Sequence, residues 1–192
     1  MRLKKTLLRV LLGKDKAEAL RVARIMRSPD RLVLVDRYIP AFATSGGRIL
    51  WVGCQAYTAA YPALLEAGGG EVWTLEFDPA AALWGREGRH RTGDLKVADV
   101  VFGDLTFDAV LCNGVLGFGV NSPEDQRTAL AAMARLLRPG GRLLLGWNTD
   151  RIADPVAASL TAAAYRPATL GDLPTRMTFP TVTHVFDLLE RA

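Results

Sequence analysis

The sequence contains only two cysteines, Cys54 and Cys112, among 192 residues. Two isolated cysteines provide neither a disulfide framework nor the spacing of metal ligands, so we expect a reducing, cytoplasmic setting and no bound metal. No apolar run approaches the ~18 residues that a membrane-spanning helix needs. There is also no internal repeat and no low-complexity tract. These absences exclude disulfide-rich secreted domains, zinc-stabilised folds and integral membrane helices.

Basic charge is scarce outside the N-terminal part of the chain. Residues 1–40 carry 11 Lys and Arg against 4 Asp and Glu, a balance of +7, whereas the other 152 residues carry 13 against 16, a balance of −3. A mildly acidic main body argues against a nucleic-acid partner. Residues 1–12 resemble a signal peptide, but Arg9 interrupts their apolar part and no cleavage site follows. We expect a basic helix there, either solvent-exposed or in weak peripheral contact with an anionic membrane.

Apolar residues make up 49% of the chain, which is ample for a folded core. From residue 48 onward, continuous apolar runs alternate with helical patterns, and such runs are typical of parallel strands covered on both faces. The alternation predicts an α/β fold, a Rossmann-like doubly wound, mostly parallel sheet with helices on both faces. We expect residues 1–47 to form a short N-terminal helical arm of the same domain as the α/β part, residues 48–192. The predicted strands are 48–52, 71–76, 107–112, 141–147 and 181–189, and the predicted helices are 14–27, 31–43, 57–67, 79–85, 123–137 and 154–165.

Small and acidic residues follow the predicted strands, at the edge where doubly wound sheets bind ligands. Gly53 ends the first strand, where a glycine lets the backbone approach a ligand closely. Glu76 comes 23 residues later at the end of the second strand and is placed to accept hydrogen bonds from ribose hydroxyls. Phe77 follows and is placed against a purine, and Asp94 lies in a Gly-Asp loop suited to an adenine amino group. Each position also fits an ordinary turn or strand end.

This order of motifs resembles the class I S-adenosylmethionine-dependent methyltransferases over residues 48–148. The similar segments are RILWVGCQAY at the first strand, FDAVLCNG at a later strand and LRPGGRLLL before the last parallel strand. The resemblance implies S-adenosylmethionine as the cofactor, with Glu76 on the ribose, Asp94 on the adenine and the Gly53 turn on the methionine part. The cofactor-binding residues that it implies are Gly53, Cys54, Gln55, Glu76, Phe77, Asp94, Leu95, Asn113 and Gly114.

The turn after the first strand departs from the family pattern, which is roughly hhDhGxGxG. Trp51 replaces the acid, and Gln55 and Tyr57 replace the second and third glycines. The nicotinamide-binding pattern G-x-G-x-x-G is also absent here. It would require glycines at positions 55 and 58, where the chain has Gln55 and Thr58. The glycine motif is therefore degenerate. Either Gly53 alone permits the close approach of the cofactor, or the domain binds a ligand without catalysing a reaction.

The sequence thus predicts a methyltransferase that acts on a small-molecule acceptor, with a non-catalytic methyltransferase-like binding protein as the alternative. An oxidoreductase that uses a nicotinamide cofactor is a more distant third hypothesis. Methyl transfer needs little acid–base help, so the protein mainly aligns the reactants and excludes water. No Asn-Pro-Pro-Tyr type motif follows strand 107–112, which disfavours methylation of a nucleobase amino group.

Few residues are candidates for acceptor chemistry. The chain has two histidines. His90, near the strand ends, is the candidate general base, whereas we expect His184, in the middle of the last strand, to be structural. Trp147 and Asn148 are candidates for the floor of a substrate pocket. Acceptor contacts are expected from the N-terminal helices, the loop 115–121 and the segment 148–178.

Overall fold

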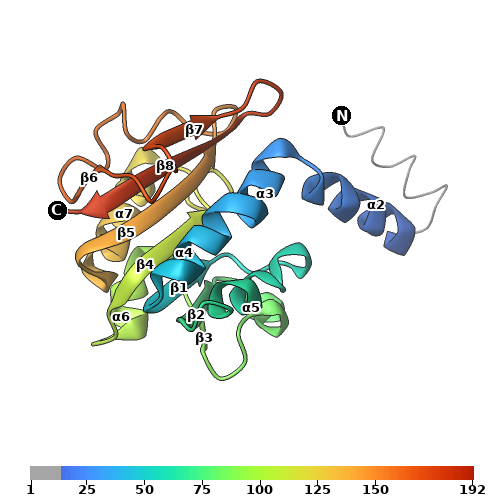
Figure 1. The fold of residues 1–192 in the computed structure, drawn as a ribbon, viewed down its shortest axis with the longest axis horizontal. Coiled ribbons are helices and arrows are strands. Elements are labelled where there is room, and N and C mark those ends of the chain that lie inside the picture. Colours follow the sequence, from blue (N-terminus) through green and yellow to red (C-terminus); the bar gives the residue numbers. More distant parts are fainter. Residues whose placement is uncertain (1–13) are drawn as a thin grey trace.

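A twisted sheet of eight strands forms the centre of the computed structural model, which describes residues 14–192 (Figure 1). The strand order is β3-β2-β1-β4-β5-β8-β6, and β7 pairs with β8 off this path. The first five strands of that order are parallel, and β8 runs antiparallel to β5, β6 and β7. The predicted doubly wound, mostly parallel sheet is therefore confirmed. The strands are β1 (Arg48–Val52), β2 (Glu71–Glu76), β3 (His90–Thr92), β4 (Phe107–Asn113), β5 (Leu137–Asn148), β6 (Tyr165–Pro167), β7 (Arg176–Thr178) and β8 (His184–Arg191).

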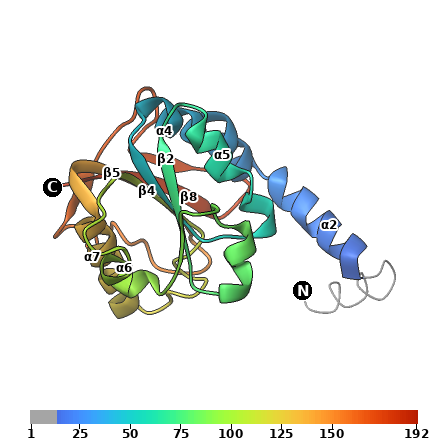
Figure 2. The same ribbon diagram turned by 90° about the horizontal axis from the view of Figure 1, so that it is seen from below.

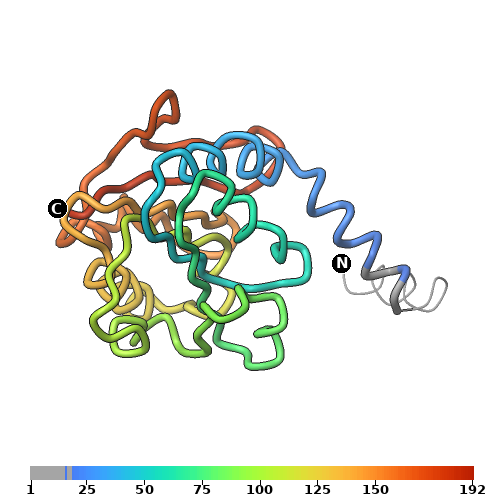
Figure 3. Tube along the Cα trace, turned by 60° about the horizontal axis from the view of Figure 1, so that its bottom comes forward, coloured from blue at the N-terminus to red at the C-terminus, as the bar shows by residue number. Residues whose placement is uncertain are grey.

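Helices cover both faces of the sheet (Figure 2). Helices α3, α4 and α5 lie on one face, and α6 and α7 lie on the other. Helix α2 projects away from the body (Figure 3), and the helix predicted for the segment before it lies outside the described residues. No helix of residues 14–192 is long and apolar enough to cross a bilayer. The helices are α2 (Lys14–Met26), α3 (Pro29–Val33), α4 (Ile39–Ser45), α5 (Tyr61–Glu66), α6 (Ala98–Phe102) and α7 (Pro123–Leu136), with a π-helical turn η1 (Leu34–Tyr38) and 3-10 turns η2 (Ala56–Thr58), η3 (Pro79–Trp84) and η4 (Leu95–Val97).

The alternation of side chains along β1 divides the core into two layers. Ile49 and Trp51 point to the face covered by α3–α5, and Leu50 and Val52 point to the face covered by α6 and α7. All four are buried, as the apolar run predicts for a central parallel strand. Trp51, at the position of the family's acid, fills the first layer and lies edge-on to Tyr61 with ring centroids 5.1 Å apart.

The segment 29–45 is one continuous helical stretch, which confirms the helix predicted for 31–43, and Pro40 lies within it. The π-helical turn η1 immediately precedes this proline. The Ile39 N–H donates to the Leu34 carbonyl, five residues back. A proline cannot donate the next helical hydrogen bond, and the wider turn relieves its ring from the carbonyl behind it. Tyr38 in this turn packs on Phe186 of β8 with ring centroids 4.9 Å apart, so the stretch belongs to the core.

The helix predicted for residues 154–165 is wrong, because that segment consists of turns. Asp154 accepts hydrogen bonds from the backbone N–H groups of Val156 and Ala157 and also pairs with Arg176. Ser159 has a φ of 57°, which breaks a helix. The alanine-rich composition favours a helix locally, but the tertiary ion pair holds the start of the segment in a turn.

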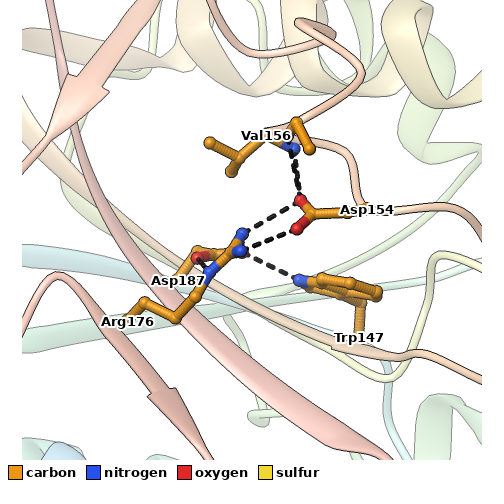
Figure 4. A network of polar contacts seen from close by, with 6 residues as sticks. Trp147, Asp154, Val156, Arg176 and Asp187 are labelled. Atoms are coloured by element: carbon orange, nitrogen blue, oxygen red, sulfur yellow. Dashed lines mark hydrogen bonds and ion pairs between the residues drawn. The ribbon is translucent and has the colours of Figure 1, made fainter.

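A buried ion network ties β5, β7 and β8 together (Figure 4). Asp187 on β8 is only 2% exposed. Its carboxylate accepts hydrogen bonds from Arg176 Nε at 2.6 Å and from Trp147 Nε1 at 2.8 Å. The same guanidinium bonds Asp154 at 2.6 and 2.9 Å. Hydrogen bonds from Arg176 lower the pKa of Asp154. The network fixes β8 against β5 at the carboxyl end of the sheet.

Replacing Arg176 by alanine is expected to lower the free energy of unfolding by about 3–5 kcal/mol, because it strips the buried Asp187 carboxylate of its cation. The matched control is Arg166→Ala, which removes an exposed pair with Glu190 on the same strand. That change is expected to cost less than about 1 kcal/mol. Urea unfolding of both variants checks the difference, and equal losses would contradict it.

Candidate functional site

A cavity of about 420 Å³ lies at the carboxyl ends of β1, β2 and β4. β1 stands between β2 and β4, so this is where the strand order changes direction and where such sheets bind ligands. Eight of the nine cofactor-binding residues suggested by the sequence line this one cavity. They are Gly53, Gln55, Glu76, Phe77, Asp94, Leu95, Asn113 and Gly114.

The turn after β1 opens the cavity through the backbone of Gly53. Its φ of 89° is a left-handed conformation that other residues rarely adopt. A methyl group added at its Cα would lie 3.3 Å from Val115 on the opposite wall. Glycine at this position therefore permits the left-handed turn and also keeps the cavity wide.

Glu76 holds the Gly53 turn in place. Its Oε2 accepts a hydrogen bond from the Cys54 N–H at 2.7 Å, and its Oε1 accepts those of Phe77 and Asp78 at 2.8 and 3.0 Å. A carboxylate offers about four acceptor sites, so one remains on the oxygen that bonds Cys54. This structural role of Glu76, which joins the ends of β1 and β2, was not evident from the sequence.

The cavity has an exposed aromatic rim beside an acidic loop. Phe77 is 71% exposed although it lines the cavity. Asp94 caps η4 by accepting the Lys96 N–H at 2.9 Å. Lys96 Nζ lies 3.6 Å from the Asp94 carboxylate and 3.0 Å from that of Asp125. The hydrogen bond with Asp125 raises the pKa of Lys96. Lys96 is a cavity residue that the sequence analysis missed.

Gln55 and Tyr57, in the turn after β1, also line the cavity. Gln55 begins η2, and its N–H donates to the Thr58 hydroxyl at 3.0 Å. Tyr57 lies beneath the Arg31 guanidinium, whose carbon is 5.3 Å from the ring centroid. The turn thus has its own hydrogen-bonded geometry, and the tyrosine ring forms a wall of the cavity.

Arg31 enters the cavity from α3 and was also missed, because the sequence shows only one more basic residue in a basic segment. Its Nε lies 3.7 Å from the Asp30 carboxylate. Its Nη1 is buried and has no hydrogen-bond partner among residues 14–192. Tyr61 lies nearby; burial raises the pKa of its hydroxyl, and the Arg31 charge counteracts that rise. A buried cation with an unused donor is suited to an oxygen of a ligand.

A second group of unpaired polar atoms lies where β4, β5 and β8 meet. Asn113 is 7% exposed and His184 is 4% exposed. Both amide atoms of Asn113 and His184 Nε2 are buried without a partner in the described part of the chain. A methyl group added to Gly146 would lie 2.0 Å from Asn113 Oδ1 and 2.9 Å from His184 Nε2. The glycine on β5 therefore leaves the space that these two side chains share.

Several candidates from the sequence lie outside the cavity. Cys54 contributes its backbone N–H to Glu76, while burial raises the pKa of its thiol, and that of Cys112, to about 12. Trp147 is buried against Asp187. His90 does not line the cavity, and its ring nitrogens lie 2.9 Å from Thr74 Oγ1 and 3.3 Å from Thr92 Oγ1.

Of the segments expected to contact the acceptor, some line the cavity and others do not. The loop after β4 contributes Val115, Phe118 and Val120 to the cavity, whereas no residue of 148–178 lines it. Arg151 stacks on Phe118 from outside, 4.8 Å from the ring centroid. Among residues 14–192, no cluster of three or more acidic, histidine or cysteine side chains is suited to a metal ion.

These features fit an adenosine-containing cofactor. One unused acceptor site on Glu76 suits a ribose hydroxyl, and the exposed Phe77 ring suits a purine. Gly53, with its left-handed backbone, leaves room for an extended ligand. The unpaired Asn113 amide offers such a ligand both a donor and an acceptor.

Comparison with known proteins agrees with this geometry. Residues 50–145, half of the chain, match the family described as "Methyltransferase domain". The ubiquinone/menaquinone biosynthesis C-methyltransferase UbiE of Pasteurella multocida is 31% identical over 113 residues, 55% of this chain and 40% of that protein. The chain covers between 20% and 40% of the length of the curated relatives it matches.

Solved structures share the fold. The N-methyltransferase NodS of Bradyrhizobium japonicum, in complex with S-adenosyl-L-homocysteine, has a TM-score of 0.65 at 16% identity, covering 88% of this chain and 90% of that one. The pre-rRNA processing protein fibrillarin of Methanococcus jannaschii has a TM-score of 0.56 at 16% identity, over 79% and 68% of the two chains. The fold alone therefore does not distinguish acceptor classes. With the family match over half of its residues, the chain belongs to the class I S-adenosylmethionine-dependent methyltransferases.

Proposed function

We propose that this chain transfers a methyl group from S-adenosylmethionine to a small-molecule acceptor. One observation carries the proposal. The strand-end residues that the family uses for its cofactor converge on a single cavity at the switch point of the sheet. The alternative, a domain that binds without catalysing, is favoured by Gln55 and Tyr57 in place of glycines.

The cofactor is proposed to lie along the carboxyl ends of β2, β1 and β4. Phe77 and Leu95 contact the adenine, Asp94 accepts its amino group, and Glu76 accepts a ribose hydroxyl. The methionine part reaches the Gly53 turn, with Gln55 beside it and Asn113-Gly114 opposite. Cys54 takes part only through its backbone, because its N–H holds Glu76.

The bound cofactor supplies a methyl group that is already activated on a sulfonium, so the protein contributes mainly alignment and exclusion of water. Val52, Leu75 and Val115 give the cavity apolar walls, which favour the exclusion of water. The Glu76 hydrogen bonds hold the turn rigid without cost at the moment of reaction. Tyr57, under Arg31, limits the space at the inner end.

A small molecule is the proposed acceptor for two reasons. Outside residues 1–40 the chain carries 13 Lys and Arg against 16 Asp and Glu, a net charge of −3, which argues against a nucleic-acid partner. The matched relative UbiE also carries a name from quinone biosynthesis.

Replacing Glu76 by alanine is expected to weaken binding of S-adenosylhomocysteine about tenfold to a hundredfold, because a charge-assisted hydrogen bond and the fixed turn are both lost. Titration calorimetry measures the affinity. Glu87→Ala, a change at an exposed carboxylate outside the cavity, is expected to leave it unchanged. If the unaltered protein does not bind S-adenosylhomocysteine at millimolar concentration, the proposal is wrong, and the alternative of a non-catalytic binding protein is favoured.

Replacing Phe77 by alanine is expected to reduce the affinity for adenosine by about 1–3 kcal/mol through the loss of base stacking. Because Phe77 is 71% exposed, the melting temperature is expected to stay the same. Leu83→Ala is the matched control, since Leu83 is 73% exposed and lies outside the cavity. Equal adenosine affinities of the two variants, measured by calorimetry, would remove Phe77 from the site.

A further inference from the structure

The unpaired atoms behind the cavity need an explanation. Leaving a buried polar group without a partner costs free energy, and native proteins usually avoid it. Here Arg31 Nη1, the Asn113 amide and His184 Nε2 are all unpaired within residues 14–192. The first two residues line the cavity, and His184 adjoins Asn113 across Gly146. Two cavity residues, on α3 and β4, and a β8 residue directly behind one of them thus carry unused polar atoms.

The surrounding hydrogen bonds determine which nitrogen of His184 carries the proton. The Thr183 hydroxyl donates to the Asp150 carboxylate at 2.7 Å, so its oxygen accepts from Asn148 Nδ2 at 3.0 Å. The Asn148 side-chain amide is therefore oriented so that its oxygen faces His184 Nδ1, 3.2 Å away. An amide oxygen only accepts, so Nδ1 carries the hydrogen.

The chain Asp150–Thr183–Asn148 therefore leaves His184 Nε2 with a free lone pair. Burial lowers the pKa of His184 to about 4, an effect that nearby Arg31 reinforces and nearby Asp30 opposes. The imidazole is thus neutral at pH 7. The neutral ring is therefore a weak base, and its unused Nε2 lone pair is available to accept a hydrogen bond from a hydroxyl group.

The charge beside the imidazole selects the kind of group that binds. Arg31 Nε lies 3.7 Å from the Asp30 carboxylate, and Arg31 Nη1 has no hydrogen-bond partner among residues 14–192. A cation at this position disfavours an ammonium group and favours an oxygen that gains negative charge. Asn113, which adjoins His184 across Gly146, adds a neutral donor and acceptor.

We propose that Arg31, Asn113 and His184 form the acceptor subsite, that the acceptor presents a hydroxyl group there, and that His184 Nε2 receives the hydroxyl proton. This deepens the proposed function and rests on it. The subsite suits a phenolic or enolic hydroxyl, whose anion Arg31 stabilises. This proposal differs from the expectation that His184 is only structural.

The proposed step is balanced as follows. Methylation makes the acceptor oxygen strongly acidic, so its O–H bond breaks as the O–C bond forms, and the proton passes to His184 Nε2. An oxygen lone pair forms the new O–C bond with the methyl carbon. The S–C bond breaks and its electron pair stays on sulfur. The products are a methyl ether and S-adenosylhomocysteine.

NMR of the two histidine rings in ¹⁵N-labelled protein tests the subsite, with His90→Gln used to assign the signals. We expect His184 to show a protonated Nδ1 and an unprotonated Nε2. In the presence of S-adenosylhomocysteine, millimolar phenol or catechol is expected to shift the Nε2 resonance, whereas anisole, which lacks the hydroxyl, and aniline are not. A protonated Nε2, or a shift with aniline and none with phenol or catechol, overturns the proposal.

Two variants separate this role from a structural one. Thr183→Val removes the exposed relay hydroxyl and is expected to give a mixture of His184 tautomers, whereas Thr181→Val, two residues away, is expected to keep one. A single tautomer in both variants contradicts the relay. Calorimetry with S-adenosylhomocysteine on the same samples distinguishes the two failures. Loss of that binding counts against the proposed function, whereas intact binding without any response of Nε2 to phenol or catechol counts against the subsite alone.

Discussion

The hydrogen bonds of Glu76 are the constraint on which the cavity depends. One carboxylate at the end of β2 binds the backbone of the next loop and reaches across to the Cys54 N–H after β1. A glycine turn with a φ of 89° has little rigidity of its own, because glycine is the most flexible residue. The carboxylate supplies that rigidity. The turn therefore presents an ordered backbone to the cavity.

The neighbouring side chains act on the turn in the same way. Trp51 is a core residue whose indole N–H donates to the Gly53 carbonyl at 2.7 Å. It thus fixes the turn from the other side of the backbone. Tyr57 is packed under Arg31. Contacts with side chains therefore hold the turn on both sides.

Much of this arrangement follows from sequence patterns, and the reason is local. Apolar runs identify β1, β2, β4 and β5 because strands covered on both faces contain few polar residues. Ser122 and Pro123 mark the start of α7, and the Asp125 N–H does donate to the Ser122 hydroxyl at 3.1 Å. The strand-end residues line one cavity because parallel strands end at the same edge.

What sequence reasoning missed depends on contacts between distant segments. Nothing in the local sequence pairs Arg31 with Tyr57 or places His184 next to Asn113. The alanine-rich segment 154–165 shows the same limit, since the ion pair of Asp154 with Arg176 overrides its helix propensity. The polar cluster could have been suspected only from two facts, that His184 lies in an apolar strand and that Gly146 interrupts another.

The position of β8 has a consequence for synthesis of the chain. β8 is the last strand in sequence, yet it lies inside the sheet between β5 and β6. Until residues 184–191 have been made, β5 is an unpaired edge with Leu143 and Leu145 on one of its faces, the kind of edge that recruits other chains. The nascent polypeptide therefore passes through an aggregation-prone stage that ends when β8 inserts. The same insertion brings His184 to Asn113, so the proposed acceptor subsite is completed only in that last step.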